Sequence, residues 1–307
     1  MQTVLITGGT GMVGQALTNY LIDNGYDVIV LTRSEKKSSR LHLTYAQWDI
    51  EKQYIDPEAL KLADIIVHLA GESVATKRWT KKRKEEIFQS RVQSGALLVK
   101  ALTEHEHKVK TFVSASAIGW YGPDTAESLQ NGFKETDTPD NSYLGATCQQ
   151  WEQSVASIAN MGIRLVTLRI GIVFNKRGGA LAEFIKPAQF GLATILGPGT
   201  QIMSWIHQQD LCKMILFAAT NENLNGAYNA VAPMPASNKQ IVELVAKKLF
   251  PFNITVKVPE LVLKIMLGEM SIEVLKSANV SSKKIQDAGF QFEYPTVEEA
   301  LSQLLKK

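Results

Sequence analysis

Cysteine is scarce in this sequence of 307 residues. The two cysteines, Cys148 and Cys212, lie far apart and form no Cys-x-x-Cys pair. This spacing argues against a disulfide framework and against a zinc site, and it suits the reducing conditions of the cytoplasm. We therefore expect both cysteines to be packing residues in a cytoplasmic protein that has no metal site.

Strong net charge and long apolar runs are also missing. The formal net charge is +3, which is too small to indicate nucleic acid or a membrane surface as a partner. No apolar run approaches the ~18 residues that cross a bilayer, and the first residues do not resemble a signal peptide. Because 45% of the residues are hydrophobic, the chain can bury a large core. These features predict a soluble, folded protein in which any recognition of an anion must be local.

The start of the chain carries the strongest local pattern. Residues 4–7 are a short apolar run typical of a buried parallel strand, and an amphipathic helix follows soon after. Gly8 and Gly11 would let the backbone approach a pyrophosphate, and Gly14 would let the helix pack closely on the strand. The free N–H groups at the helix start favour an anion. The G-x-x-G-x-x-G spacing differs from the usual Rossmann G-x-G-x-x-G, but its place between strand and helix favours a dinucleotide site over a purely steric turn.

Basic residues follow the second apolar run, which spans residues 27–32. Arg33 stands just past the end of this expected strand with Ser34 beside it, and no acidic residue occupies the strand tip. In dinucleotide folds an acidic residue near this point binds the adenosine ribose, whereas a basic residue can pair with a 2′-phosphate. The pattern favours NADP over NAD, and the alternative is a solvated basic loop.

The apolar runs also predict the fold class. Further strands are expected at residues 43–48, 64–71, 110–114 and 163–170, with helices between them. This alternation indicates an α/β protein with a Rossmann-like, doubly wound parallel sheet over residues 1–170. Residues 171–307 are expected to form a smaller C-terminal α/β substrate lobe. Its expected elements are a strand at 201–206, a helix capped by Asp210, and helices near 181–188, 239–249 and 296–305.

Ligands of open α/β sheets bind at the carboxyl ends of the strands. Ala70, Gly71 and Glu72 should therefore face the cofactor, whereas His68, inside the apolar run, is expected to be a core residue. Asp49 ends the third strand and is either an adenine contact or a turn former. The basic run at 77–84 is expected to be a solvated helix start, with contact to an anionic substrate or phosphate as the alternative.

Several motifs together resemble the extended short-chain dehydrogenase/reductase superfamily, and within it the NAD(P)-dependent epimerase/dehydratase family. Residues 7–14 are similar to its cofactor loop, residues 114–116 and 120–122 to its active-site strand end, and residues 204–210 to its substrate-lobe motif. More narrowly, residues 68–72, 78–80, 90–91 and 151–152 resemble an epimerase-like branch thought to bind NADP. The resemblance implies these cofactor-binding residues: Gly8, Thr10, Gly11, Met12, Val13, Gly14, Arg33, Ser34, Asp49, Leu69, Ala70, Gly71, Glu72, Arg91, Ser114 and Arg169.

The chemistry of that superfamily uses a Ser or Thr and a Tyr-x-x-x-Lys pair. Ser116 and Tyr143 match the hydroxyl-bearing positions and are the expected catalytic residues, but Thr147 stands where the lysine is expected. Without that cation a phenol near its reference pKa of ~10 is a poor general base. A neutral phenol can still protonate an alkoxide formed by hydride delivery from NADPH, so the departure disfavours oxidation more than reduction.

Two hypotheses for function follow. The first is an NADP(H)-dependent oxidoreductase or epimerase-like enzyme that acts on a small polar or sugar-like carbonyl or alcohol, with a homodimer as one option for its assembly. The second is a non-catalytic NADP(H)-binding sensor, which stays an alternative because Thr147 stands at the position of the catalytic lysine. In the C-terminal lobe, Trp205 and His207 are candidate substrate-side residues, and the alternative for His207 is a hydrogen bond that fixes the strand end.

Overall fold

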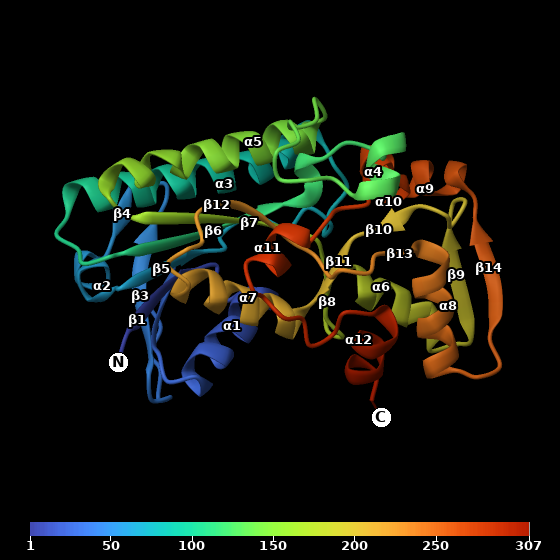
Figure 1. Cartoon of the computed structure of the whole chain (residues 1–307), viewed down its shortest axis with the longest axis horizontal. Coiled ribbons are helices and arrows are strands. Elements are labelled where there is room, and N and C mark those ends of the chain that lie inside the picture. Colours follow the sequence, from blue (N-terminus) through green and yellow to red (C-terminus); the bar gives the residue numbers. More distant parts are fainter. Residues whose placement is uncertain (307) are drawn as a thin grey trace.

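The computed structural model describes residues 1–306 and is built around one large sheet (Figure 1). Its strands lie in the order β12-β7-β6-β5-β1-β2-β3-β4. Neighbouring strands are parallel, except that β4 pairs with β3 in the antiparallel sense. The strands are β1 (Thr3–Thr7), β2 (Asp27–Thr32), β3 (Leu43–Asp49), β4 (Tyr54–Ile55), β5 (Ile65–His68), β6 (Thr111–Ala117), β7 (Arg164–Ile170) and β12 (Gly226–Ala230).

Helices cover both faces of this sheet because its central strands are apolar on both sides. In β1, Val4 and Ile6 belong to one core cluster, whereas Leu5 belongs to another. The first cluster lies under α1 (Met12–Asp23) and α7 (Gln208–Thr220), and the second under α2 (Pro57–Leu62), α3 (Lys81–Glu104) and α5 (Tyr143–Val155). Figure 1 shows α3 and α5 along one face and α1 and α7 along the other.

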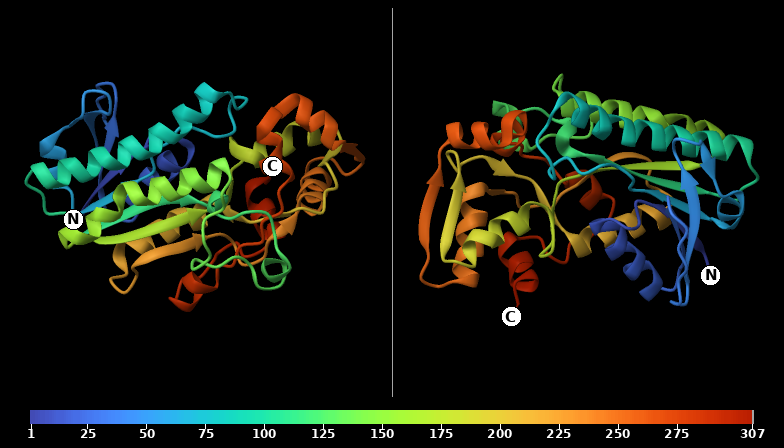
Figure 2. Two further views of the ribbon diagram at one scale, coloured as in Figure 1. Left: turned by 90° about the horizontal axis from the view of Figure 1, so that it is seen from above. Right: turned by 180° about the vertical axis from the view of Figure 1, so that it is seen from behind.

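A smaller lobe with its own core lies at one end of the large sheet (Figure 2). Buried side chains of α6, α8 and α12 close on a short two-stranded sheet of β9 and β14 there. The described elements of this region are β8 (Ile172–Phe174), α6 (Gly179–Ala188), β9 (Leu192–Leu196), β10 (Ile202–Met203), β11 (Trp205–His207), β13 (Ala236–Ser237), α8 (Asn238–Leu249), β14 (Ile254–Val258), α9 (Glu260–Leu267), α10 (Ser271–Leu275) and α12 (Val297–Leu304). The helix α11 (Lys283–Asp287) instead packs against β12, with Ile285 in the core cluster of the large sheet. The short α4 (Ala126–Asn131) precedes α5.

The doubly wound parallel sheet is confirmed, with two additional strands. The edge strand β12 pairs with β7, and α7 packs on the same core as α1, so the chain returns to the large sheet after leaving it at β7. The division of the chain at residue 170 stays a prediction, and residues 208–230 would have to be counted with the large sheet. None of the helices within residues 1–306 is both long and apolar enough to span a bilayer.

Two expectations about local structure are wrong. The expected strand at 201–206 is split into β10 and β11, which pair with different strands. Asp210 does not cap α7, because the side chain of His207 is the N-cap and accepts the backbone N–H of Gln209. The Asp210 carboxylate instead accepts the backbone N–H groups of residues 293 and 294 and so anchors the C-terminal segment.

Close approach of α1 to the first strand depends on Gly14. A Cβ at this position would lie 2.3 Å from the carbonyl oxygen of Gly8 and 2.5 Å from the Cα of Gly9. Both neighbours are backbone atoms of a tight turn, so neither can yield by a side-chain rotation. Gly14 therefore sets how near the helix start can come to the turn.

We expect Gly14→Ala to lower the free energy of unfolding by about 2 kcal/mol, although alanine would favour the helix by about 1 kcal/mol at an unhindered site. Chemical denaturation monitored by circular dichroism measures the change. Gly162→Ala is the control, because a Cβ there meets open space and only the positive φ of 76° opposes it. If Gly14→Ala were as mild as this control, close packing would not be the reason for the glycine.

Candidate functional site

The glycine turn presents an open helix start. Gly11 is the N-cap of α1, no side chain caps this end, and no acidic residue lies in the first turn. A Cβ on Gly11 would meet only the Gly8 carbonyl oxygen, at 3.3 Å. Thr10 and Gly11 are exposed, and Met12 and Val13 are half-buried. The N–H groups of the first turn and the positive end of the helix dipole are therefore free to meet an anion.

Two residues near this turn were not predicted from the sequence. Gly9 packs against β2, since a Cβ there would lie 2.6 Å from Cγ1 of Val30. Thr7 holds the end of β5, because its Oγ1 accepts the backbone N–H groups of Leu69 and Ala70 at 3.2 and 3.1 Å. The adjacent glycines at positions 8 and 9 could have indicated the close packing at Gly9. The Thr7 contacts could not be predicted, because they join residues far apart in the sequence.

His68 is a core residue, as predicted. It is fully buried, with Nδ1 2.7 Å from Thr7 Oγ1 and Nε2 3.3 Å from Ser94 Oγ. Since Thr7 Oγ1 already accepts two N–H groups, its proton points to Nδ1, which leaves the hydrogen of the neutral ring on Nε2. Burial lowers the pKa of His68 to about 3, and the positive charge of Arg91 acts in the same direction.

The basic residues after β2 remain available to a ligand. Arg33 and Ser34 are exposed, and within residues 1–306 the Arg33 guanidinium makes no ion pair. Arg40 differs, because it pairs with Asp23 at 3.5 Å and also bonds to Asn19. At the next strand Asp49 acts as a turn former: its Oδ1 accepts the backbone N–H groups of residues 51 and 52, and the bond from Lys52 lowers the pKa of its carboxyl.

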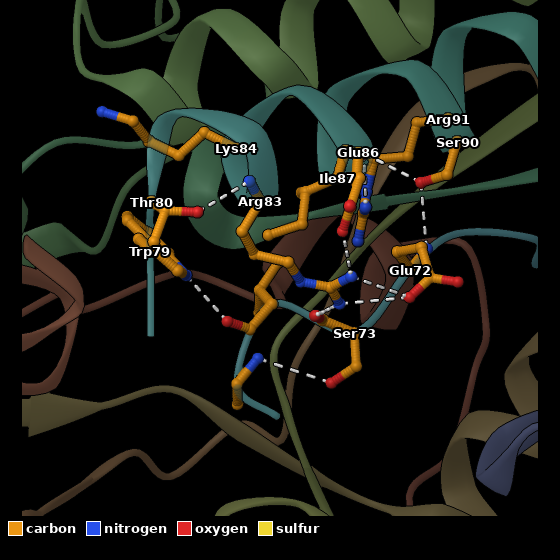
Figure 3. Close-up of polar contacts among 12 residues, drawn as sticks. Glu72, Ser73, Trp79, Thr80, Arg83, Lys84, Glu86, Ile87, Ser90 and Arg91 are labelled. Carbon is orange, nitrogen blue, oxygen red and sulfur yellow. Dashed lines mark hydrogen bonds and ion pairs between the residues drawn. The ribbon is translucent and has the colours of Figure 1, made fainter. Parts of the chain in front are cut away.

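Arg83 of α3 binds residues 72 and 73, which follow β5 (Figure 3). Arg83 is buried, and its guanidinium donates to Glu72 Oε2 at 3.1 Å, to the Ser73 carbonyl at 2.6 Å and to Glu86 Oε2 at 3.0 Å. Thr80 is the N-cap of α3, so the basic run does begin a helix as expected, but Arg83 is buried rather than in solvent. Glu72, expected to face the cofactor, is thus oriented by an arginine of the basic run.

Tyr143 begins α5 and its hydroxyl donates to the backbone carbonyl of Lys84 at 2.7 Å. The ring packs edge-on against Trp79, and Thr147 turns back to donate to the Tyr143 carbonyl. Burial raises the pKa of the Tyr143 phenol, so the group is neutral. A groove of about 360 Å³ opens beside it, lined by Lys81, Lys84, Glu85, Phe88, Tyr143, Ala146 and Thr147.

Ser116 lies in a buried polar network at the ends of β6 and β7. Its Oγ donates to Glu152 Oε1 at 2.7 Å, and Glu152 also receives two hydrogen bonds from Arg169. The Arg169 guanidinium further donates to Tyr121 and to the Glu135 carbonyl and stacks on the Trp120 ring, 3.6 Å from its centroid. Arg169 is therefore committed to protein partners, so the geometry does not favour the expected cofactor contact.

Three further sequence expectations concern buried residues. Ser114 is fully buried on β6, and its hydroxyl donates to the Ala115 carbonyl, so a cofactor contact would need rearrangement. Trp205 is fully buried and stacks on Phe174 in the core of the smaller lobe, which contradicts a substrate-side position. His207 is the cap of α7 and also contacts Gln303, so the alternative of a strand-end hydrogen bond is confirmed.

Residues 4–230 match the model of the NAD dependent epimerase/dehydratase family. The chain belongs to this family. Residues 258–304 match a second model, a domain of unknown function named DUF1731. The first match ends with β12, where the chain completes the large sheet.

Curated relatives in the family match over nearly the whole length. Epimerase family protein YfhF of Bacillus subtilis is 36% identical over 98% of this chain and 97% of its own. Epimerase family protein SAR0825 of Staphylococcus aureus is 34% identical over 100% of both chains.

Solved structures extend this likeness. A crystal structure of human epimerase family protein SDR39U1 (isoform 2) with NADPH has a TM-score of 0.88 and 26% identity over 99% of both chains. A nucleoside-diphosphate sugar epimerase from Corynebacterium glutamicum has a TM-score of 0.78 and 29% identity, over 99% of this chain and 58% of that one.

The buried neutral state of His68 predicts a pH dependence. The folded pKa of about 3 lies below the ordinary value of 6.5, so the unfolded chain binds a proton at this residue between these values and the folded protein does not. The stabilisation is complete above pH 6.5 and is lost as the pH falls toward 3, by up to about 1.4 kcal/mol per pH unit. The difference in unfolding free energy between wild type and His68→Gln should therefore shrink on acidification.

Denaturant titrations at a series of pH values measure this difference. The exposed His105, changed to Gln, serves as the control. A wild-type advantage over His68→Gln that stays constant from neutral pH to about pH 4 would contradict the assignment.

Proposed function

We propose that this protein binds NADP(H) and acts as an oxidoreductase or epimerase-like enzyme on a small polar or sugar-like carbonyl or alcohol. The observation that carries the proposal is the uncapped, acid-free start of α1 beside the glycine turn. A pyrophosphate there would receive the N–H groups of the first turn, which have no other task, in the field of the helix dipole.

The preference for NADP over NAD rests on the tip of β2. Arg33 is exposed and makes no ion pair within residues 1–306, and residues 32–34 at the strand tip include no acidic side chain that would repel a 2′-phosphate. A guanidinium can bind a phosphate through two parallel hydrogen bonds. The NADPH in the crystal structure of human SDR39U1 supports the same choice.

The residues around the site divide the work between them. Residues 10–13 would hold the pyrophosphate, and Arg33 would hold the 2′-phosphate. Ala70 and Gly71 would lie beside the coenzyme between its pyrophosphate and its nicotinamide. The bound coenzyme supplies or accepts the hydride. Tyr143, neutral because burial raises its pKa, would give a proton to the substrate oxygen after its hydroxyl leaves the Lys84 carbonyl, and Ser116 would donate a second hydrogen bond.

A non-catalytic NADP(H) sensor is the second candidate. The observation that favours it is that both hydroxyls proposed for chemistry are already bonded to protein acceptors, Ser116 to Glu152 and Tyr143 to Lys84. Thr147, which stands at the position of the lysine of related enzymes, supplies no cation to orient a coenzyme ribose.

Arg33→Ala should weaken NADPH binding by roughly tenfold and leave NADH binding unchanged, because only NADPH has the 2′-phosphate. Isothermal titration calorimetry with both nucleotides measures the two dissociation constants. Arg40→Ala is a matched control, since Arg40 already pairs with Asp23. Equal NADPH affinity in wild type and Arg33→Ala would refute the 2′-phosphate assignment.

Measuring turnover with NADPH distinguishes the enzyme hypothesis from the sensor hypothesis. With NADPH and a panel of small aldehydes, ketones and keto-sugars, Ser116→Ala and Tyr143→Phe should each lower kcat by about 100-fold while NADPH affinity is retained. NADPH oxidation at its absorbance band gives the rates. Wild-type protein that binds NADPH tightly but turns over none of the panel would favour the sensor.

A further inference from the structure

The strands β12 and β14 both lie at the edge of a sheet, and β12 has its outer edge closed by side chains. The Ala227 carbonyl, which points away from β7, accepts a hydrogen bond from Lys284 Nζ at 2.6 Å. The Asn229 N–H, which points the same way, donates to Glu135 Oε1 at 2.8 Å. The outward backbone groups of β12 are therefore already bonded, and no further strand can pair with them.

The outer edge of β14 is open. The Ile254 N–H and the Val258 carbonyl, at the two ends of the strand, both bond to residues that flank β9. Because successive residues of a strand turn their backbone groups to opposite sides, Thr255 and Lys257 turn theirs away from β9. Within residues 1–306 these outward groups make no hydrogen bond. Figure 1 shows β14 as the outermost strand of the smaller lobe, with β9 beside it.

The side chains around this open edge are apolar and exposed. Ile254 and Val256 lie on one face of the strand and are 69% and 41% exposed, and Phe252, just before the strand, is 89% exposed. A standard interface buries roughly 800 Å² on each partner, and the apolar side chains exposed between residues 252 and 266 present a surface of that order. An unprotected apolar edge strand is a site for pairing with another strand. Those on α9, which follows β14 directly, are Leu261, Val262, Ile265 and Met266.

The strand is complementary to a second copy of itself. In an antiparallel pair centred on Val256, all five residues of β14 face a residue of the other copy. Val256 faces its own counterpart, Ile254 faces Val258, and Thr255 faces Lys257. The outward groups of Thr255 and Lys257 then form the hydrogen-bonded pairs, as an antiparallel ladder requires. The charge of Lys257 lies opposite a hydroxyl rather than opposite a like charge, which would be destabilising.

We propose that this chain forms a homodimer in which the β14 strands of two copies pair antiparallel about a two-fold axis at Val256. The two-stranded sheets of β9 and β14 then join into one continuous sheet. The same arrangement brings the start of α9 in one copy beside the exposed Phe252 of the other, so apolar side chains of both segments leave water. Because each copy uses the same surface, the assembly closes at two copies.

Cysteine cross-linking tests the register of this dimer. Val256→Cys puts a thiol at the axis, where facing Cα atoms of a non-hydrogen-bonded pair lie about 4.5 Å apart and can be bridged by a disulfide. Ile254→Cys is the matched control on the same face, because its two copies would lie roughly 14 Å apart. We expect mild oxidation to cross-link Val256→Cys and not Ile254→Cys. Cys148 and Cys212 are buried, so neither competes for the new thiols.

Sedimentation equilibrium over a range of protein concentrations measures the dimer dissociation constant. Thr255→Pro removes an outward N–H that has no partner within the protomer and puts a ring in the edge, so it should weaken dimerisation at least tenfold. Thr255→Val keeps the N–H and the size of the side chain and should dimerise as wild type does. Circular dichroism shows whether each variant is folded.

Three results would overturn the proposal. The first is a wild type that stays monomeric throughout the concentration range; if that monomer also co-sediments with vesicles of phosphatidylcholine and phosphatidylglycerol, the apolar face serves a membrane instead. The second is a wild-type dimer that folded Thr255→Pro leaves unchanged. The third is equal cross-linking of Val256→Cys and Ile254→Cys, or of neither, which would place the interface elsewhere.

Discussion

The close approach of α1 to the first strand is the constraint on which the site depends. Gly14 brings the helix to within backbone contact of the turn, and Gly9 lets the same turn pack on β2. The N-cap of this helix is Gly11, which has no side chain to cap the helix start, so the N–H groups of the first turn stay unused. The open helix start thus follows from a glycine at the N-cap, and Thr7 fixes the end of β5 beside the turn.

Three arginines near the strand ends show how burial alone does not define a role. The Arg83 guanidinium donates hydrogen bonds to Glu72, to Glu86 and to the Ser73 carbonyl, and these bonds hold the segment after β5 in place. Arg169 is saturated by Glu152, Tyr121 and Glu135, and so ties β7 to the loop before α5. Arg91 alone of the three makes no ion pair within residues 1–306. The two arginines that pair with a carboxylate hold protein segments in place, whereas Arg91 has a single side-chain hydrogen bond within residues 1–306, to the Ile87 carbonyl.

Sequence reasoning succeeded where the signal is local. The apolar run of β1 and the glycine turn before α1 depend on neighbours within a few residues. It failed where partners are distant: β12 is a short strand that pairs with β7 across the whole excursion into the smaller lobe, and Asp210 anchors residues 293 and 294. The burial of Trp205 could not be predicted for the same reason, because the motif at residues 204–210 gives the residue types but not the direction in which each side chain points.

The threonine at position 147 has consequences for the neighbouring residues. Its hydroxyl turns back onto its own helix, and Tyr143 reaches across to the carbonyl of Lys84 rather than being held by a cation one turn on. The positive charge near the phenol now comes from α3, where Arg91 lowers the pKa of Tyr143 against the larger effect of burial. Burial prevails, so the phenol keeps its proton. A phenol held in this way is a far better proton donor than proton acceptor.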